Sequence, residues 1–393
     1  MRRILIYITS LLFLIFLFSC EETKEINENP DLAKVNIKFD TLSSSGKVPC
    51  VVLLNDSVVY NARIKQRGGS SIGYPKKSYT VKLDEKQSLY GLIENKSWVF
   101  TSSYLEKSLI RNILSYDLFR SWDDDNFAPK IKLIEFSHNG NYEGIYQLTE
   151  KVNRRSLGIK KKTEGALIFK DCAVFSKTRI EPQSGETYYH QKYPKPKKAD
   201  YTIFMDSLKE FILHAPDNVF SNEVERKFDI DNIIDWQIMI MLANNGDAVY
   251  KNFYLYRKGE KEKFKISLWD YDSGFGRDTD NELNLMKTTS HWERNSLIDR
   301  LYNKNVNNYQ ARLHARWKEL REIGKVSVSD FETRVDILVK ELEPHVARNF
   351  ERWPVTDSYY WDDYTWEQEI EVLKEFINLR IPQLDEKFNY NGR

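Results

Sequence analysis

Four acidic or amide side chains in the second half of the chain have the types and spacing that phosphoryl transfer requires. In the segment Asp247-Ala-Val-Tyr-Lys-Asn252 an Asn follows an Asp by five residues, and Asp270 and Asp272 come soon after. Phosphoryl transfer needs a carboxylate that orients the acceptor hydroxyl and oxygen ligands that hold a divalent metal. Asp247 is the candidate for the first role, and Asn252, Asp270 and Asp272 are the candidates for the second. The alternative is an Asp–Asn spacing that arose by chance, followed by an acidic turn.

A small-residue loop in the first hundred residues is the candidate for holding phosphates. It contains Gly68, Gly69, Ser70 and Ser71, and Lys76 and Lys77 follow it at the start of an expected strand. Glycines let backbone N–H groups approach phosphate oxygens, and a lysine on the next strand supplies the cation. Gly73 lies five residues after Gly68, as in a Walker A loop. However, Tyr74 replaces the lysine of that motif, so the sequence excludes a Walker A site. A plain hairpin turn followed by surface lysines is the alternative.

The elements that would position these residues follow from periodicity. Apolar alternation predicts strands within 47–100 and near 131–137 and 143–149, and helical spacing predicts a helix near 105–121, which makes a unit of five strands and a helix. A buried helix is expected at 229–243, just before Asp247, with strands at 252–257 and 264–269. Further helices are expected near 294–322, 328–348 and 366–379. The basic stretch 181–200 is predicted to be a mobile surface loop, and its charge is more typical of a solvated face than of a binding site.

Composition excludes several classes of protein. The chain has 393 residues with 59 Lys+Arg and 58 Asp+Glu, a net charge of +1, so nothing drives it toward nucleic acid as a polyelectrolyte. The histidines are scattered without metal-ligand spacing and no CxxC occurs, which disfavours a zinc enzyme. The absence of GxSxG disfavours a hydrolase of that type. A glycosidase could use Asp247 and Asp270, but it would leave Asn252 and the glycine loop unexplained.

The N-terminus is predicted to be a lipoprotein signal peptide. Arg2 and Arg3 precede an apolar run, and the run ends in Leu17-Phe18-Ser19-Cys20. This tetrapeptide resembles a bacterial lipobox, which implies that Cys20 is lipidated. An ordinary signal peptide is the alternative. We therefore expect a signal peptide at 1–19, a polar tether at 20–34, and a folded domain in the cell envelope that meets the membrane only through its lipid.

Five blocks of the sequence, in order, resemble the CotH family, which is named for a spore-coat protein and consists of atypical secreted protein kinases. They are RIKQRGGSSIGYPKKSYTVKL, SWVFTSSYLEKSLIRN, NGNYEGIYQLTEKV, NNGDAVYKNFYLYR and ISLWDYDSGFG, and they lie within about residues 60–280. The resemblance implies an α+β, two-lobed, atypical protein-kinase-like fold. A β-rich N-lobe would span 35–152 and a mainly helical C-lobe 153–393.

The resemblance also implies roles for individual residues. Lys77 or Lys76 would contact phosphate, Asp247 would be the catalytic Asp, and Asn252 and Asp270 would bind metal. Glu150 would lie near the hinge beside the nucleotide base, and Arg111 matches a family arginine to which we assign no role. ATP would be the donor with Mg²⁺ or Mn²⁺, and the acceptor would be Ser or Thr of an exported protein.

The sequence leaves two alternatives open. The chain could be an inactive pseudokinase or a cell-surface module that binds a protein or glycan, for which exposed rings among 353–366 would be suited. Packing of these rings between helices is the simpler interpretation of the same residues. The chain could also transfer phosphate to a small molecule or a glycan.

Overall fold

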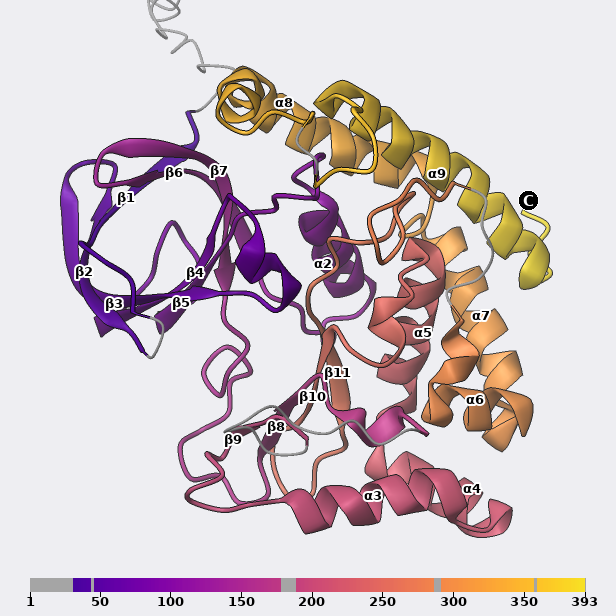
Figure 1. Cartoon of the computed structure of the whole chain (residues 1–393). Coiled ribbons are helices and arrows are strands. Elements are labelled where there is room, and N and C mark those ends of the chain that lie inside the picture. Colours follow the sequence, from indigo (N-terminus) through magenta and orange to yellow (C-terminus); the bar gives the residue numbers. More distant parts are fainter. Residues whose placement is uncertain (1–30, 44–45, 178–188, 286–290, 357–358, 393) are drawn as a thin grey trace, which may run out of the picture. The chain divides into compact units, whose positions relative to one another are not determined.

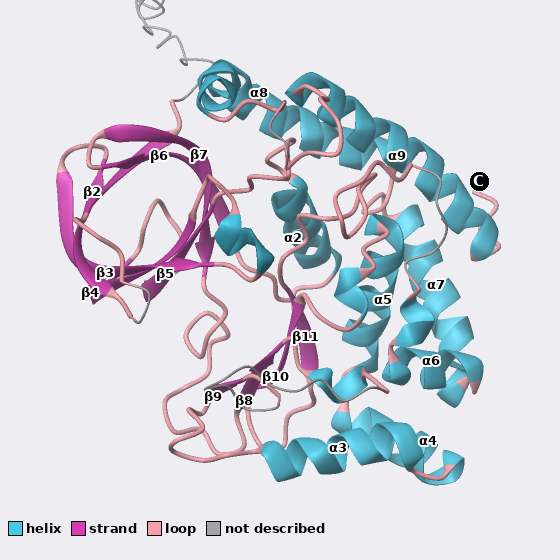
Figure 2. Cartoon of the chain, viewed as in Figure 1, coloured by secondary structure: helices cyan, strands magenta, loops and turns pink. Residues whose placement is uncertain are grey.

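The computed structural model describes residues 31–43, 46–177, 189–285, 291–356 and 359–392, except for the side chain of Ser70. Residues Leu32–Arg393 form one compact unit. Within the described residues the first part of this unit is rich in strands and the later part is mainly helical (Figures 1 and 2). The expected α+β class is therefore confirmed. The predicted signal peptide and Cys20 lie outside the described residues.

Within the described residues, seven strands close into a barrel in the order β1-β2-β3-β4-β5-β7-β6. They are β1 (Ala33–Lys38), β2 (Val48–Leu54), β3 (Val58–Arg67), β4 (Ser78–Gln87), β5 (Asn95–Thr101), β6 (Ile131–His138) and β7 (Asn141–Glu150). Along β3, Ala62 and Ile64 are buried while Arg63 and Lys65 are exposed, as a strand with one face on a core requires. Large side chains such as Trp98, Phe136 and Tyr146 fill the interior.

The prediction of five strands and a helix was incomplete, because the barrel is closed by a pairing that no local pattern shows. The short β1 pairs in parallel with β6, so that Val35 lies opposite Phe136. About a hundred residues separate these partners in the sequence. Periodicity reports which face of a strand is buried, but it does not report which distant strand it pairs with.

A second sheet, in the order β11-β10-β8-β9, lies beside the buried helix α5 (Ile230–Ala243). Its strands are β8 (Leu167–Lys170), β9 (Gln191–Tyr193), β10 (Phe253–Arg257) and β11 (Lys265–Leu268). Asp229 caps the start of α5 by accepting from the amide of Asn232, and Asn244 ends it in the left-handed conformation. The predicted helix 229–243 and the two strands after it are confirmed to within a residue or two. β9 lies inside the predicted loop 181–200, of which 178–188 is not described.

Several of the remaining helices contact α5, and one of them contacts β7 of the barrel (Figure 1). They are α2 (Arg111–Trp122), α3 (Thr202–His214), α4 (Asp217–Lys227), α6 (Ser296–Asn303), α7 (Tyr309–Glu322), α8 (Val328–Arg352) and α9 (Trp366–Lys387). The single helix expected at 294–322 was wrong: Asn305, Asn307 and Asn308 have positive φ and separate α6 from α7. None of the described helices has the length and apolar character needed to span a membrane.

Candidate functional site

The segment that carries Asp247 begins where α5 ends. Asn245 links this segment to residue 273 through its side chain. Its Nδ2 donates to Ser273 O (2.9 Å), and its Oδ1 accepts from Ala248 N (3.0 Å). Phe275 N donates to Ala243 O (2.7 Å), which joins the same two stretches a second time. The Asp247 segment is thereby hydrogen-bonded to the segment that follows β11.

Asn252 and Asp270 form a third link between these segments. Both are in the left-handed conformation, with φ of 61° and 60°, which Asn and Asp tolerate better than other non-glycine residues. The Asn252 Nδ2 donates to Asp270 O (2.8 Å), and Trp269 N donates to Asn252 O (3.1 Å). The backbone N–H of Asn252 donates to Asp171 Oδ1 (2.9 Å). Two predicted site residues are thus adjacent, and their backbone angles are held by specific partners.

Helix α2 holds the Asp270 segment from the other side. Asp270 N donates to the Tyr116 hydroxyl (2.8 Å), and Tyr271 N donates to Asn112 Oδ1 (2.7 Å). Arg111 Nε donates to Gly274 O (3.0 Å). Three side chains from two turns of α2 therefore fix the backbone at 270–274.

Arg111 also belongs to a buried network of ion pairs, which gives it a structural role. Its guanidinium contacts Glu106 (2.6 Å) and Glu369 of α9 (3.1 Å) and is fully buried. Glu369 also pairs with Arg277, which pairs with Asp362 at 2.5 Å. Partial burial alone would raise the pKa of Asp362, but hydrogen bonds from Arg277 and Lys107 lower it to about 2. The network connects α2, the Asp270 segment and α9.

Two of the three candidate carboxylates, Asp272 and Asp247, have raised pKa values, in part because of neighbouring carboxylates. Burial, followed by the charges of Asp270, Glu106 and Asp247, raises the pKa of Asp272 to about 7. Burial also raises the pKa of Asp247, while the Lys251 ammonium, 2.8 Å away, acts in the opposite direction. A divalent cation would relieve this repulsion.

The donor types suit Mg²⁺ or Mn²⁺, since carboxylate and amide oxygens are the hard ligands these ions prefer. Asn252 Nδ2 is used by Asp270 O, which leaves the amide oxygen of Asn252 as its donor atom. In the part of the chain that is described, no three acidic, His or Cys side chains lie close enough to hold a metal by themselves. Mg²⁺ is commonly held by one or two carboxylates together with substrate phosphates, so Asp270 and Asp272 with a nucleotide remain a fitting set.

The glycine loop forms a short helical turn, Ser70–Gly73, between β3 and β4. Gly68 has φ +147°, and a Cβ there would lie 2.6 Å from Ser71 Oγ, so this position requires glycine. Ile72 O accepts from Gln66 Nε2 (2.9 Å) and from Lys77 Nζ (3.2 Å). Gly69 has open space around it. No direct contact joins this turn to Asp247 or Asp270 among the described residues, so the loop roles of Gly68, Gly69, Ser70 and Ser71 remain predictions.

The two lysines after the loop have different surroundings. Lys76 is buried, with Nζ donating to Ile145 O (2.7 Å) and to Asn349 Oδ1 of α8 (3.1 Å). Burial lowers its pKa to about 7. Lys77 is half-buried, and its amine caps the loop. Of the two, Lys77 is the one whose amine lies on the loop.

Glu150 ends β7 and is engaged by backbone amides. Its oxygens accept from Ile93 N (2.8 Å) and Lys130 N (3.1 Å), and the residue is 3% exposed. This side chain anchors two loops of the barrel. A role for Glu150 in a hinge beside a nucleotide base remains a prediction. Because both of its side-chain oxygens are already used, the contacts with the base would come from neighbouring backbone groups.

Sequence reasoning missed several residues around the site. Asp171 and Tyr116 hold Asn252 and Asp270, yet each is distant in sequence from its partner. Lys251 pairs with Asp247 and could have been found, since an i,i+4 Asp–Lys pair is visible in the sequence. Arg67, the last residue of β3, lies 5.5 Å from the ring of Trp269, next to Asp270. This contact places the start of the glycine loop near the segment that carries Asp270.

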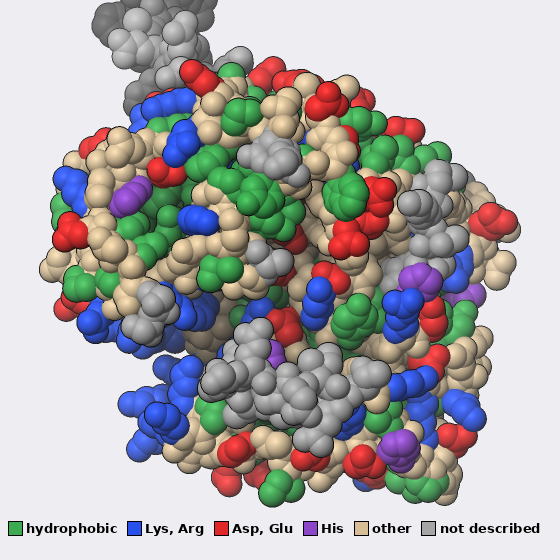
Figure 3. Space-filling view, viewed as in Figure 1, with side chains coloured by type: hydrophobic (Ala, Val, Ile, Leu, Met, Phe, Trp, Pro, Cys, Tyr) green, Lys and Arg blue, Asp and Glu red, His purple; other side chains and the backbone are tan. Residues whose placement is uncertain are grey.

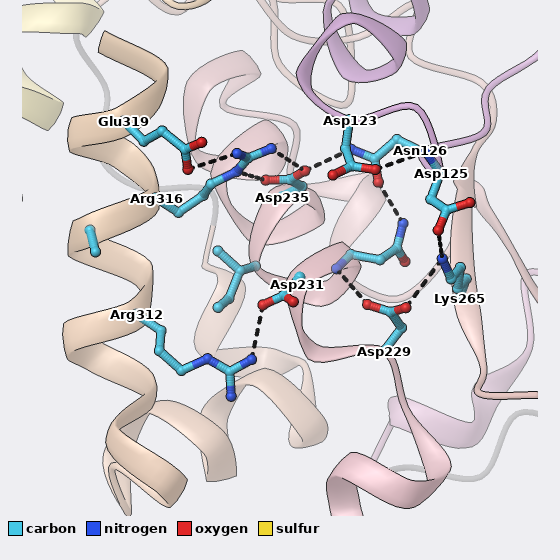
Figure 4. A pocket seen from close by; sticks show the side chains of 13 residues that line it. Asp123, Asp125, Asn126, Asp229, Asp231, Asp235, Lys265, Arg312, Arg316 and Glu319 are labelled. Carbon is cyan, nitrogen blue, oxygen red and sulfur yellow. Dashed lines mark hydrogen bonds and ion pairs between the residues drawn. The ribbon is translucent and has the colours of Figure 1, made fainter. Parts of the chain in front are cut away.

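A cavity of about 480 Å³ lies at the other end of α5 (Figure 4). Most of its charged side chains are paired with one another, for example Asp235 with Arg316 (2.8 Å), Asp231 with Arg312 (2.9 Å) and Asp229 with Lys265 (3.1 Å). Asp247 follows the opposite end of the same helix. This cavity is therefore separate from the predicted site.

Comparison with known proteins agrees with the blocks identified in the sequence. Residues 64–383 match the model of a family described as CotH kinase protein. The chain is 26% identical over 346 residues to the inner spore coat protein H of Bacillus subtilis (strain 168), which covers 86% of this chain and 90% of that protein. A crystal structure of the Helicobacter pylori proinflammatory kinase CtkA covers 79% of this chain and 92% of that one. Its identity is 8% and its TM-score of 0.29 is too low to establish a common fold.

Proposed function

The chain belongs to the CotH family, and from this premise we propose that it is a metal-dependent kinase that transfers the γ-phosphate of ATP to Ser or Thr of an exported protein. The observation that carries the proposal is the joining of the Asp247 and Asp270 segments. Links through Asn245, Phe275 and Asn252 hold the two segments together. The family match supports a kinase-like protein, and the donor, metal and acceptor are part of the proposal.

Asp247 would act on the acceptor. Its carboxylate would accept a hydrogen bond from the Ser or Thr hydroxyl and take its proton as the oxygen attacks the γ-phosphorus. A bond forms between that oxygen and the phosphorus, and the bond from phosphorus to the β–γ bridging oxygen breaks, so that ADP leaves. Lys251, at 2.8 Å, would hold Asp247 ionised before the transfer.

Asn252, Asp270 and Asp272 would hold the metal, which when bound neutralises charge on the β- and γ-phosphate oxygens. The contacts from α2 hold the backbone at Asp270 and Tyr271, so the position from which the Asp270 side chain extends is set before the nucleotide binds. Lys77 would reach phosphate from the glycine loop after releasing Ile72 O.

The experiment that tests this function is a transfer assay with radiolabelled ATP, Mn²⁺ or Mg²⁺, and a mixture of exported proteins from the source cells. Asp247→Asn should lower the rate of transfer by at least about a hundredfold, since it removes the proton acceptor. The matched control is Asp56→Asn, an exposed turn residue with φ of 57° that Asn also tolerates. Equal rates for wild type and Asp247→Asn would contradict the proposal.

We also propose that Cys20 carries a lipid that anchors the protein in the cell envelope. The proposal is supported by the basic and apolar residues before it and the Leu-Phe-Ser-Cys pattern. Cells grown with radiolabelled palmitate should incorporate label into the wild-type protein and not into Cys20→Ala. Equal labelling of the two proteins would contradict lipidation at this residue.

The binding-module alternative gains limited support from the ring cluster near the C-terminus. Trp366 is buried and donates to Ser108 O (3.1 Å), and Trp353 donates to Glu143 O (2.9 Å). Trp361 is 65% exposed. Four of the six rings, Trp353, Tyr360, Tyr364 and Trp366, are buried or half-buried, as expected if they pack between elements, which weakens the case for a surface that stacks on glycans.

A further inference from the structure

Like charges face one another on the outer surface of the barrel. Arg63 of β3 lies directly opposite Lys82 of β4, and both side chains are exposed. Lys65 lies two residues from Arg63, on the same face of β3. Like charges directly opposite across two strands destabilise a sheet. This pair of like charges therefore lowers the stability of the barrel, and a role in binding would explain why both residues are present.

These residues belong to a larger basic cluster that includes both sides of a cleft. We define the basic cluster as Lys47, Arg63, Lys65, Arg67, Lys82, Lys151, Lys192 and Lys195. The pKa of Lys47 is lowered by burial and then by Lys65, Lys82, Lys195 and Arg63, so these groups lie within electrostatic reach of one another. Burial and then Lys47, Lys195, Arg67 and Lys192 lower the pKa of Lys151 to about 8.

The cluster includes residues from separate elements. Arg63, Lys65 and Lys82 are on the barrel, whereas Lys195 follows β9 of the second sheet. Figure 3 shows Lys and Arg side chains gathered on the lower edge of the barrel and on the edge of the lower part that faces it, with a hollow between them. Among the described residues, no acidic side chain forms an ion pair with Lys47, Lys65, Lys82 or Lys151. Within the described part of the chain, no ion pair competes with a ligand for these four ammonium groups.

The cluster begins at the candidate site. The guanidinium of Arg67 lies 5.5 Å from the Trp269 ring, and Asp270 follows Trp269. From Arg67, the residues Lys65 and Arg63 lie on the same face of β3 and extend about 13 Å along the strand at ~3.3 Å per residue. A chain seated along this row would have one end at the carboxylates and the rest over the cluster.

We propose that the basic cluster binds an acidic stretch of the acceptor polypeptide, with Glu, Asp or phosphorylated residues a few positions from the Ser or Thr that is modified. This inference rests on the proposed function and names the class of acceptor. A cluster present on both sides of a cleft fits an extended chain between them better than a flat membrane. The row of charges reaches farther from Asp270 than the phosphates of one nucleotide, which assigns Arg63 and Lys82 to the acceptor.

The test measures peptide binding without ATP, so that it does not depend on catalysis. The purified full chain is titrated into two fluorescent 15-residue peptides that share the same Ser positions, one rich in Glu and the other rich in Lys. The Glu-rich peptide should bind, and its affinity should fall between 50 and 200 mM NaCl because such contacts are screened. Arg63→Gln/Lys82→Gln should raise its Kd about tenfold, roughly the loss of two favourable charge contacts.

The matched control is Lys340→Gln/Lys387→Gln, which removes the same charge from exposed positions on α8 and α9. It should leave the Kd of the Glu-rich peptide unchanged. ATP affinity, measured in parallel, should be the same in all three proteins. If the Glu-rich peptide binds but no phosphate is transferred, the kinase proposal fails and the proposal of an acidic ligand stands.

Three results would overturn the inference. The first is equal or tighter binding of the Lys-rich peptide. The second is an equal loss of ATP affinity in Arg63→Gln/Lys82→Gln, which would assign the cluster to the nucleotide. The third is tighter binding of an oligonucleotide or of anionic lipid vesicles than of the Glu-rich peptide, since that would assign the cluster to another class of ligand.

Discussion

Two adjacent lysines, Lys76 and Lys77, show how much a residue's role depends on partners that are distant in sequence. Both follow the glycine loop and both carry the same side chain. Lys76 is turned into the interface between β7 and α8, where Asn349 and Ile145 accept from its amine. Lys77 stays on the loop. The sequence leaves the choice between them open, because Asn349 lies 273 residues from Lys76.

The buried amine of Lys76 predicts a pH dependence of stability. Its pKa is about 7 in the folded protein against a usual value of 10.5, so the unfolded chain binds more protons between these values. The free energy of unfolding should therefore rise with pH from about 7 to 10, by at most ~1.4 kcal/mol per pH unit from this group. Lys76→Met should remove that contribution, as measured by urea unfolding at pH 7, 8 and 9.

The control for this prediction is Lys77→Met, which removes the same amine from a half-buried position on the loop. Because this variant keeps the Lys76 amine, its free energy of unfolding should still rise between pH 7 and 9. A constant difference between Lys76→Met and wild type would show that the Lys76 amine does not lose its proton in this range.

At the scale of elements, α2 is the part that organises the candidate site. Arg111, Asn112 and Tyr116 each hold a backbone group of the segment 270–274. The helix was expected to begin near 105 and begins at Arg111, because residues 105–110 form a loop in which Glu106 accepts from Arg111. The network therefore needs both the loop and the helix.

Tyr116→Phe tests whether the position of the Asp270 backbone affects phosphate transfer while the Asp270 carboxylate itself is kept. It removes the hydroxyl that accepts from Asp270 N and leaves that buried amide without a partner, which costs about 1–3 kcal/mol of stability. The kcat for phosphate transfer should fall several-fold, while the KM for the acceptor stays near wild type. Tyr142→Phe, in β7 with its ring 3.8 Å from the Arg348 guanidinium and, among the described residues, no contact with the Asp270 segment, is the matched control. An unchanged kcat in Tyr116→Phe would show that this contact from α2 is not needed for phosphate transfer.

For the whole molecule, the parts that could be predicted from the sequence are those with strong local patterns. The apolar helix 229–243, the turn to Asp247 and the strands that lead to Asp270 follow from periodicity and capping. Closure of the barrel, the burial of Lys76 and the contacts of Asp171 and Tyr116 depend on residues far apart in the chain. The break between α6 and α7 was missed because left-handed Asn residues leave the helical spacing of apolar residues intact.

The most direct test of the nucleotide site is a calorimetric titration of ATP into the purified full chain, with and without Mg²⁺ or Mn²⁺. We expect binding that requires the metal, is lost in Asp270→Asn and is retained in the exposed control Asp56→Asn. Absence of binding with either metal, or equal binding in Asp270→Asn, would contradict a nucleotide site built on Asp270 and Asn252.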